Sequence, residues 1–229
     1  MKKKYKNCKM FAMSILSTCE IKCSCGETFE AELWKAVNVF DDPDLRDVIL
    51  SGRFNTVQCS KCSKFFYHEH FFMYQDLQNE LIAYVYPKEN QSMAGEFRNK
   101  MLSEFKELID GIEEFKKIDF EPVLYFGIED LVSTLNHEDN IKDETDIVDI
   151  ISKTLDFDII DIKPSKARNL CIVNKIPKIK KSTGNLKSDI ILGLEKLLKY
   201  NPNLNEYKNL FTRIKQNNFC LDEILLHKR

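Results

Sequence analysis

Two pairs of closely spaced cysteines constrain the fold of this 229-residue chain more than any other feature. One residue separates Cys23 from Cys25, two residues separate Cys59 from Cys62, and a long apolar insert lies between the pairs. Four thiolates at such spacing satisfy a Zn²⁺ ion completely and leave no open coordination position. A closed site of this kind organises a fold and performs no chemistry. The sequence therefore predicts one structural zinc ion with Cys23, Cys25, Cys59 and Cys62 as its ligands.

The residues beside these pairs suit tight turns, with departures from the usual zinc-binding pattern. Gly26 directly follows Cys25 and permits the tight backbone path of a thiolate turn. Ser63 stands where a glycine often follows a CxxC pair, and the first pair has one intervening residue rather than two. Four thiolates also suit iron, and only the usual prevalence of zinc in ribbons favours zinc. The alternative is four reduced thiols in an aromatic core without a metal.

The other cysteines favour a reducing setting over a disulfide framework. Eight cysteines are an even number, but adjacent pairs are better metal clamps than cross-links between distant loops. Cys8, Cys171 and Cys220 stand singly and are expected to be buried thiols. Thiol exchange at the second pair is disfavoured, because a redox CxxC motif normally opens a helix, whereas the strand-like residues 65–67 follow here. We therefore expect a cytoplasmic protein.

Composition is that of a soluble globular protein, with 43% hydrophobic and 31% charged residues. The net charge of −2 gives no global attraction to nucleic acid or membrane, and no run approaches the roughly 18 apolar residues of a spanning helix. Residues 1–19 have a basic start, a short apolar stretch and then Cys19, which faintly resembles a bacterial lipoprotein signal. The apolar stretch is near the minimum length, and Thr18 is a poor residue before a lipidated cysteine. An exported lipoprotein anchored at Cys19 is therefore the minor alternative.

Apolar periodicity predicts an α+β protein. Alternation predicts a strand pair that turns at the first cysteine pair. An aspartate cap followed by Pro43 predicts a short helix that ends at Gly52. Further strands are expected over residues 54–58, 65–74 and 80–86.

Helices dominate after residue 87. Apolar residues recur at helical spacing from Met93 to Phe115 and predict an amphipathic helix of about six turns. The remaining expected elements are helices over about 127–136 and 144–155, strands over about 157–162 and 170–173, and two final helices separated by Asn201-Pro202-Asn203. We therefore expect a zinc-ribbon-like antiparallel β module with an inserted short helix over residues 18–87, followed by a helix-rich α/β domain over residues 88–229.

Charge is distributed in blocks along this second part. Residues 119–161 hold 13 acidic residues and two lysines, a net charge of −11, whereas residues 163–187 hold eight basic residues and no acidic ones. Charge blocks are usually solvated faces, so we expect the two blocks to balance each other. The alternative is a weak polyanion contact; no aromatic residue is interleaved to stack on bases. Its candidate residues are Lys175, Lys178, Lys180 and Lys181.

Other constellations are weaker. His68 and His70 could supply a spare ligand or a second metal site, but without a third ligand nearby they are expected to lie on the surface. Asp158, Asp161 and Lys163 resemble the acidic residues and lysine of some metal-dependent nucleases, yet strand alternation puts the two aspartates on opposite faces. The sequence has no Walker loop, Gly-rich dinucleotide turn or nucleophile elbow. It therefore nominates no catalytic and no cofactor-binding residue.

Several short segments between Ile21 and Pro87 resemble the sequence pattern of one known family. The segments are Cys23-Ser24-Cys25-Gly26, Phe29 to Trp34 with Val37-Asn38-Val39, Asp42 to Leu45, Cys59 with Cys62, and Glu80 to Pro87. Together they resemble the CpXC domain, a bacterial and archaeal family named for its paired cysteine motifs. Phe126-Gly127 and the segment from Leu194 to Tyr207 also resemble the C-terminal extension of longer members.

The resemblance implies that cysteines 23, 25, 59 and 62 are the signature positions of the family. The chain departs from the family pattern with Ser24 and Ser60 where proline is usual, and with Ser63 after the second pair. Because the family's activity is uncharacterised, the resemblance implies a fold and no reaction.

Two functions are compatible with these observations. The first is a zinc-stabilised interaction module that binds a protein or nucleic-acid partner through an aromatic surface oriented by the zinc site. The aromatic residues expected to exceed what one small sheet face can bury are Phe65, Phe66, Tyr67, Phe71, Phe72 and Tyr74. The second is an enzyme whose active site lies in the C-terminal part without a recognisable motif.

Overall fold

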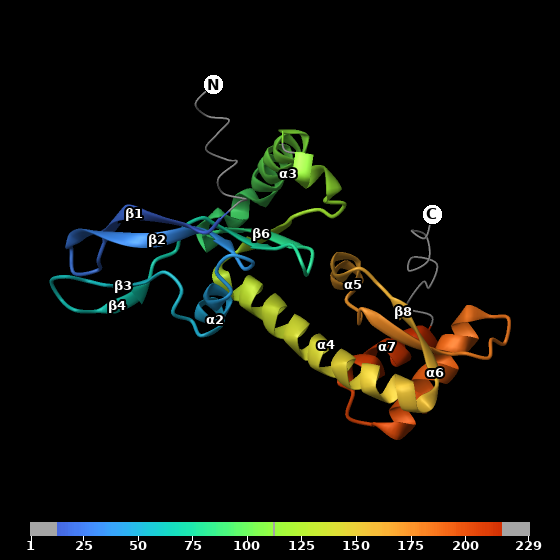
Figure 1. Cartoon of the computed structure of the whole chain (residues 1–229). Coiled ribbons are helices and arrows are strands. Elements are labelled where there is room, and N and C mark those ends of the chain that lie inside the picture. Colours follow the sequence, from blue (N-terminus) through green and yellow to red (C-terminus); the bar gives the residue numbers. More distant parts are fainter. Residues whose placement is uncertain (1–12, 112, 217–229) are drawn as a thin grey trace. The chain divides into compact units, whose positions relative to one another are not determined.

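The computed structural model of the chain describes residues 13–111 and 113–216 (Figure 1). The chain divides into two compact units between Asn136 and His137. The expected α+β class is confirmed, because an N-terminal sheet precedes a helix-rich part. Among the described residues, no helix is both long enough and apolar enough to cross a membrane.

A five-stranded sheet forms the centre of the first unit, in the order β1-β2-β5-β6-β7. The β1–β2 and β5–β6 pairs are antiparallel, whereas β2–β5 and β6–β7 are parallel, so the sheet is mixed. A separate two-stranded sheet pairs β3 with β4. The strands are β1 (Ile15–Lys22), β2 (Thr28–Asn38), β3 (Thr56–Gln58), β4 (Phe65–Tyr67), β5 (Phe72–Asp76), β6 (Leu81–Tyr86) and β7 (Val123–Phe126).

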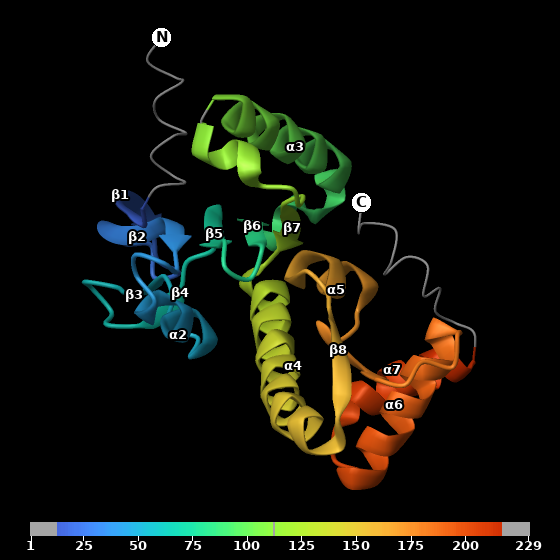
Figure 2. The same ribbon diagram turned by 45° about the vertical axis from the view of Figure 1, so that its right-hand side comes forward.

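The central strands β5 and β6 of the five-stranded sheet are covered on both faces. Alternate residues of β6 point to opposite faces, and all six are buried. One set packs with Leu45 of α2 and Leu131 of α4, and the other with Met101 and Phe105 of α3. Figures 1 and 2 show α3 on one side of β6 and α2 on the other. The helical segments are α2 (Asp44–Leu50), η1 (Lys88–Met93), α3 (Ala94–Gly111), η2 (Glu113–Lys117) and the start of α4 (Ile128–Leu155).

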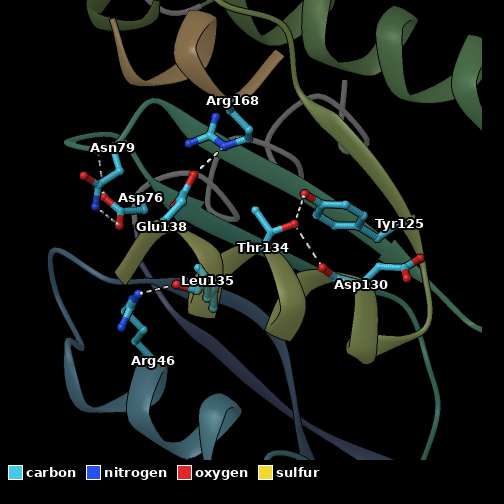
Figure 3. Close-up of polar contacts among 9 residues, drawn as sticks. All are labelled: Arg46, Asp76, Asn79, Tyr125, Asp130, Thr134, Leu135, Glu138 and Arg168. Carbon is cyan, nitrogen blue, oxygen red and sulfur yellow. Dashed lines mark hydrogen bonds and ion pairs between the residues drawn. The ribbon is translucent and has the colours of Figure 1, made fainter. Parts of the chain in front are cut away.

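Polar contacts attach α4 to its neighbours within the first unit (Figure 3). The Thr134 hydroxyl lies 2.8 Å from the Tyr125 hydroxyl of β7 and donates to the Asp130 carbonyl at 3.0 Å. Arg46 of α2 donates to the Leu135 carbonyl at 3.4 Å. The first turns of α4 are therefore fixed to β7 and α2 by hydrogen bonds as well as by apolar packing.

The second unit surrounds one apolar core with a two-stranded sheet and helices. Ile160 of β8, Ile176 of β9 and Leu194 of α6 are buried in this core. Tyr207 is also buried there, and its hydroxyl donates to the Lys175 carbonyl at 2.9 Å. Besides α4, the elements are β8 (Phe157–Asp161), α5 (Pro164–Leu170), β9 (Lys175–Ile179), α6 (Leu186–Tyr200) and α7 (Asn205–Lys215).

The acidic and basic blocks pair with each other inside this unit, as expected. Three lysines of the basic segment form ion pairs with carboxylates of α4, β8 and the residue between them. The pairs are Lys175 with Asp149, Lys178 with Asp158 at 2.8 Å, and Lys180 with Asp156. Much of the positive charge of this segment is therefore compensated locally.

A single helix, α4, replaces the two helices predicted over residues 127–136 and 144–155. The polar middle of α4 interrupts the apolar periodicity because its side chains make polar contacts instead. Glu138 accepts a hydrogen bond from Arg168 of α5 at 2.5 Å (Figure 3). The Glu144 carboxylate accepts from the backbone N–H groups of Asn205 and Glu206 at 2.7 and 2.9 Å. These contacts cap the start of α7, where no capping side chain is present at Leu204.

Other predicted boundaries were wrong for local reasons. The strand predicted over 65–74 is two strands, because β4 pairs with β3 whereas β5 pairs with β2 and β6. No strand forms at residues 170–173: Leu170 ends α5, Cys171 adopts a left-handed backbone (φ 50°), and β9 starts four residues after Cys171. The helix predicted to reach residue 115 ends at Gly111.

The start of α2 also differs from expectation. Pro43 occupies the cap position, and no side chain caps this helix, so the expected aspartate cap is wrong. The expected end of the helix is confirmed, because Gly52 has a positive φ of 70° and its N–H donates to the Ile49 carbonyl.

Gly193 allows α6 to pack directly on the backbone of β9. A Cβ at this position would lie 2.6 Å from the Pro177 carbonyl oxygen and 2.9 Å from the Lys178 Cα. We expect Gly193→Ala to lower the free energy of unfolding by about 1–3 kcal/mol, because backbone must move to admit the methyl group. Urea unfolding followed by circular dichroism measures this change.

The matched control is Gly95→Ala in α3, where a Cβ meets nothing within 4 Å. This variant should be neutral or stabilised by up to about 1 kcal/mol through helix propensity. Equal destabilisation by both substitutions would contradict a role for close packing at Gly193.

Candidate metal centre

The sulfur atoms of the four paired cysteines meet at one point of the first unit. All four Sγ atoms lie within 4.8 Å of one another. Cys23 Sγ is 3.7 Å from Cys62 Sγ, and Cys25 Sγ is 3.7 Å from Cys59 Sγ. Tetrahedral zinc with Zn–S bonds of about 2.3 Å requires sulfur atoms about 3.8 Å apart. The donor set and its spacing therefore fit a tetrahedral thiolate-bound cation.

The first cysteine pair lies in a turn between β1 and β2, which we call knuckle 1 (Cys23–Glu27). The Cys23 N–H donates to the Glu27 carbonyl at 2.8 Å, and the Gly26 N–H donates to the Cys23 carbonyl at 2.9 Å. Gly26 has a φ of 91°, a conformation that favours glycine. The predicted strand pair turning at these cysteines is thus confirmed, and Gly26 closes the turn.

The second pair lies between β3 and β4 in knuckle 2 (Cys59–Lys64), which repeats the same hydrogen bonds. The Cys59 N–H donates to the Lys64 carbonyl at 3.0 Å, and the Ser63 N–H donates to the Cys59 carbonyl at 2.9 Å. Ser63 has a φ of 58° and occupies the left-handed position that glycine occupies in knuckle 1. The departure of Ser63 from the usual pattern therefore places a strained residue in an otherwise equivalent turn.

A small apolar core holds the β1–β2 hairpin against the β3–β4 sheet beside the sulfur atoms. Its buried residues are Ile21 and Leu33 from the hairpin and Val57 from β3. The Phe29 and Phe66 rings meet edge to face with centroids 6.5 Å apart. This core is too small to hold the two sheets together strongly, so a cross-link between the knuckles has a large effect on their association.

Asn55 provides a second link that the sequence analysis missed. Its side chain accepts from the Trp34 N–H at 2.8 Å and donates to the Trp34 carbonyl at 3.1 Å. The residue is buried, and its φ of 48° lies in the left-handed region that asparagine tolerates. Asn55 thus fixes the start of β3 to the edge of β2. An asparagine inside the strand predicted over residues 54–58 was the only signal of this role in the sequence.

Exposure divides the four ligand candidates into two classes. Cys23 and Cys59 are buried, with 3% and 1% of their surface exposed, whereas Cys25 and Cys62 are exposed. Lys61 of knuckle 2 lies 3.5 Å from the Glu27 carboxylate of knuckle 1, so one ion pair also joins the two turns at the surface. Each knuckle thus offers one buried and one exposed sulfur atom.

Hydrogen bonds and mutual repulsion set opposite pKa shifts for the two thiols of knuckle 1. The backbone N–H of Cys25 stabilises the Cys23 thiolate and lowers the pKa of Cys23 to about 6. The backbone N–H of Glu27 favours the Cys25 thiolate, but the adjacent Cys23 sulfur, burial and the sulfurs of knuckle 2 outweigh it and raise the pKa of Cys25 to about 11. Neighbouring thiolates are therefore unfavourable unless a cation compensates their charge.

The two histidines do not join this centre. Among the described residues, the four cysteines are the one group of three or more potential metal ligands whose donor atoms lie close together. The His68 and His70 rings stack on each other with centroids 6.2 Å apart. Both ring nitrogens of His70 are buried and lack a hydrogen-bond partner within the described part of the chain. Burial, followed by the charges of His68 and Lys35, lowers the pKa of His70 to about 4. The expected surface location is therefore wrong for His70.

Only one of the six residues of the expected aromatic surface is exposed, because the central strands of the main sheet are covered on both faces. Phe65 is 64% exposed at the end of knuckle 2. The other five aromatic residues pack inside or are partly buried: Phe66 in the small core, Phe72 and Tyr74 under α2, Phe71 on Tyr86, and Tyr67 at half exposure.

The prediction that the single cysteines are buried thiols is wrong for Cys171. Cys171 is exposed rather than buried, and Cys19 is half-buried with its Sγ 3.8 Å from the Ser17 carbonyl. Cys8 and Cys220 lie outside the described residues.

Comparison with known proteins identifies one family. The sequence model of the CpXC protein family matches residues 21–131, a range that contains all four clustered cysteines. No curated protein and no solved structure is significantly similar to the chain.

Substitution of Ser63, which has a positive φ, should raise the stability of the metal centre. We expect Ser63→Gly to stabilise the folded protein by about 1 kcal/mol, because glycine adopts the left-handed conformation without strain. Thermal unfolding and competition with a zinc chelator measure the gain. The control Ser60→Gly lies in the same turn without a positive φ and should be neutral or destabilising. A loss of stability on Ser63→Gly would contradict the strain at this position.

His70 should make stability depend on pH. Its pKa of about 4 in the folded protein lies below the ordinary value of 6.5, so the unfolded chain takes up the proton first as pH falls. The contribution of neutral His70 is complete above about pH 6.5 and is lost progressively down to about pH 4. We expect His70→Leu to flatten this part of the profile, measured as urea midpoints at about pH 7 and about pH 5.

Because acid also protonates thiols in every variant, the relevant quantity is the difference between each variant and the wild type. Identical slopes for wild type and His70→Leu would contradict the role of His70.

Proposed function

Because the chain belongs to the CpXC family through residues 21–131, we propose that its first unit is a metal-stabilised interaction module with one structural Zn²⁺. Cys23, Cys25, Cys59 and Cys62 hold the ion. The main support for this proposal is that the four sulfur atoms lie within 4.8 Å of one another. Two pairs of sulfur atoms from opposite knuckles are 3.7 Å apart. Four thiolates fill a tetrahedral shell, so the ion supplies a cross-link and no catalysis.

The role of the cross-link follows from what it joins. Knuckle 1 belongs to the β1–β2 hairpin, and knuckle 2 belongs to the β3–β4 sheet. The small core, Asn55 and the Lys61–Glu27 ion pair also link these parts. The cation fixes knuckle 2 in position and neutralises thiolates that otherwise repel one another.

The proposed binding surface is the exposed run of knuckle 2 and its exit. Residues 60–65 are all exposed and include Lys61, Lys64 and the aromatic ring of Phe65. An aromatic residue and two cations on a fixed turn suit contacts with a protein or a nucleic-acid partner. A reducing, cytoplasmic setting keeps the four thiols available for the metal.

A weak polyanion contact through Lys175, Lys178, Lys180 and Lys181 is a separate, minor part of this proposal. The ion pairs of the first three lysines leave little uncompensated charge, so such binding is weak and sensitive to salt. Binding of an oligonucleotide that disappears on adding salt would indicate this contact alone.

Metal content tests the proposed centre. We expect about one zinc per chain in untagged protein, the occupancy of one closed four-thiolate site, and its loss in Cys59→Ser/Cys62→Ser, measured by elemental mass spectrometry. The control Cys171→Ser removes an exposed cysteine of the second unit and should retain the metal. Iron in place of zinc would change the identity of the ion, and a folded wild type without any metal would refute the centre.

The chain's single tryptophan reports the structural consequence in the same samples. Trp34 lies on β2, and its backbone is held by Asn55 at the start of β3. Removal of the metal by a chelator should therefore change Trp34 fluorescence, and zinc should restore it. Unchanged fluorescence on removal would contradict a structural role for the ion.

A further inference from the structure

We propose that the four clustered cysteines are also a site of reversible oxidative modification, in which disulfides between the two knuckles replace the metal as the cross-link. This inference rests on the proposed metal centre, because the same four sulfur atoms serve both states. It adds a chemical state in which the module keeps its structure without a cation.

The sulfur geometry brings two pairs that join one knuckle to the other within a short movement of bonding. The two 3.7 Å approaches are Cys23 to Cys62 and Cys25 to Cys59. A disulfide bond is about 2.05 Å long, so each pair must close by about 1.6 Å, or less than about 1 Å for each sulfur. Shifts of this size lie within the reach of side-chain rotation.

Exposure assigns different roles to the two members of each pair. Cys62 and Cys25 are exposed and accessible to an oxidant, whereas their partners Cys23 and Cys59 are buried. An exposed thiol that is oxidised first and a protected thiol that resolves it are the two groups that disulfide formation requires. Both cross-knuckle pairs contain one of each.

The oxidant is a hydroperoxide, which accepts two electrons from each pair of thiolates. The exposed thiolate attacks one peroxide oxygen, which forms an S–O bond, breaks the O–O bond and releases hydroxide. The buried thiolate then attacks the oxidised sulfur, which forms the S–S bond, breaks the S–O bond and releases a second hydroxide. Each pair gives two electrons to one hydrogen peroxide, and two protons convert the hydroxides to water. Loss of the thiolates releases the cation with its charge unchanged.

Chain connectivity gives cross-knuckle disulfides a structural effect that pairs within a knuckle lack. They link residues 39 and 34 positions apart, and they hold the hairpin core residues Ile21 and Leu33 against Val57 of β3. Disulfides within a knuckle would close rings of only a few residues, remove little chain entropy and leave the two sheets unlinked. The oxidised, metal-free module should therefore remain folded.

The experiment treats the zinc-loaded full chain with hydrogen peroxide, follows zinc release with a metal-sensitive dye, and maps disulfides after alkylation and trypsin cleavage. Trypsin cleavage distinguishes disulfides between the knuckles from disulfides within each knuckle. The cleavage sites are Lys22, Lys35, Arg53, Lys61 and Lys64. Cys23 and Cys25 fall in peptide 23–35, Cys59 in peptide 54–61 and Cys62 in peptide 62–64. Cross-knuckle pairing joins all three peptides into one species, which is the expected result.

Two outcomes would overturn the proposal. The first is an internally bonded peptide 23–35 together with a separate species that joins 54–61 to 62–64, which indicates pairing within each knuckle. The second is zinc retention with all four thiols still free to be alkylated. That result leaves the metal centre intact, whereas absence of zinc before treatment refutes the centre independently of the disulfides.

Two further measurements complete the test. Dithiothreitol followed by zinc should restore the original metal content and Trp34 fluorescence, whereas irreversible loss would contradict a reversible modification. Cys171→Ser should release zinc at the wild-type rate, because its exposed thiol is not part of the cluster. A slower release in this variant would place the first oxidation at Cys171 and contradict the proposed site.

Discussion

Charge compensation at four converging sulfur atoms is the constraint on which the first unit depends. The backbone N–H groups of the knuckles orient the thiols and favour ionisation at Cys23, but the adjacent sulfurs raise the pKa of Cys25. The fold therefore brings together groups that repel one another once ionised. A cation between them or covalent bonds among them resolve this repulsion, and either one ties knuckle 1 to knuckle 2.

Coverage of the central strands of the main sheet on both faces limits what the unit can present to a partner. The central strand β6 is buried throughout, with α3 on one face and with α2 and the start of α4 on the other. Of the six aromatic residues between Phe65 and Tyr74, only Phe65 is consequently exposed. The exposed surface near the sulfurs is thus a fixed turn rather than a broad sheet face.

Local chemistry predicted the knuckles well, because the spacing of the cysteines and the glycine after Cys25 act over a few residues. The break between β4 and β5 could not be predicted locally, since it depends on which distant strand each segment pairs with. The role of Asn55 likewise depends on the backbone of Trp34, 21 positions away. The family match extends through residue 131 and so includes strand β7. This strand pairs with β6 in the main sheet, although the predicted β module ended at residue 87.

The capping of α7 by Glu144 has a consequence for the order in which the second unit can form. The helix has no capping side chain at its own first position, and the carboxylate that accepts its free N–H groups belongs to α4, about 60 residues earlier. During synthesis the acceptor therefore exists long before the donors emerge. Helix α7 therefore completes a scaffold that is already partly built, and a ribosome-bound product that stops before Asn205 would lack the N–H groups that the Glu144 carboxylate accepts.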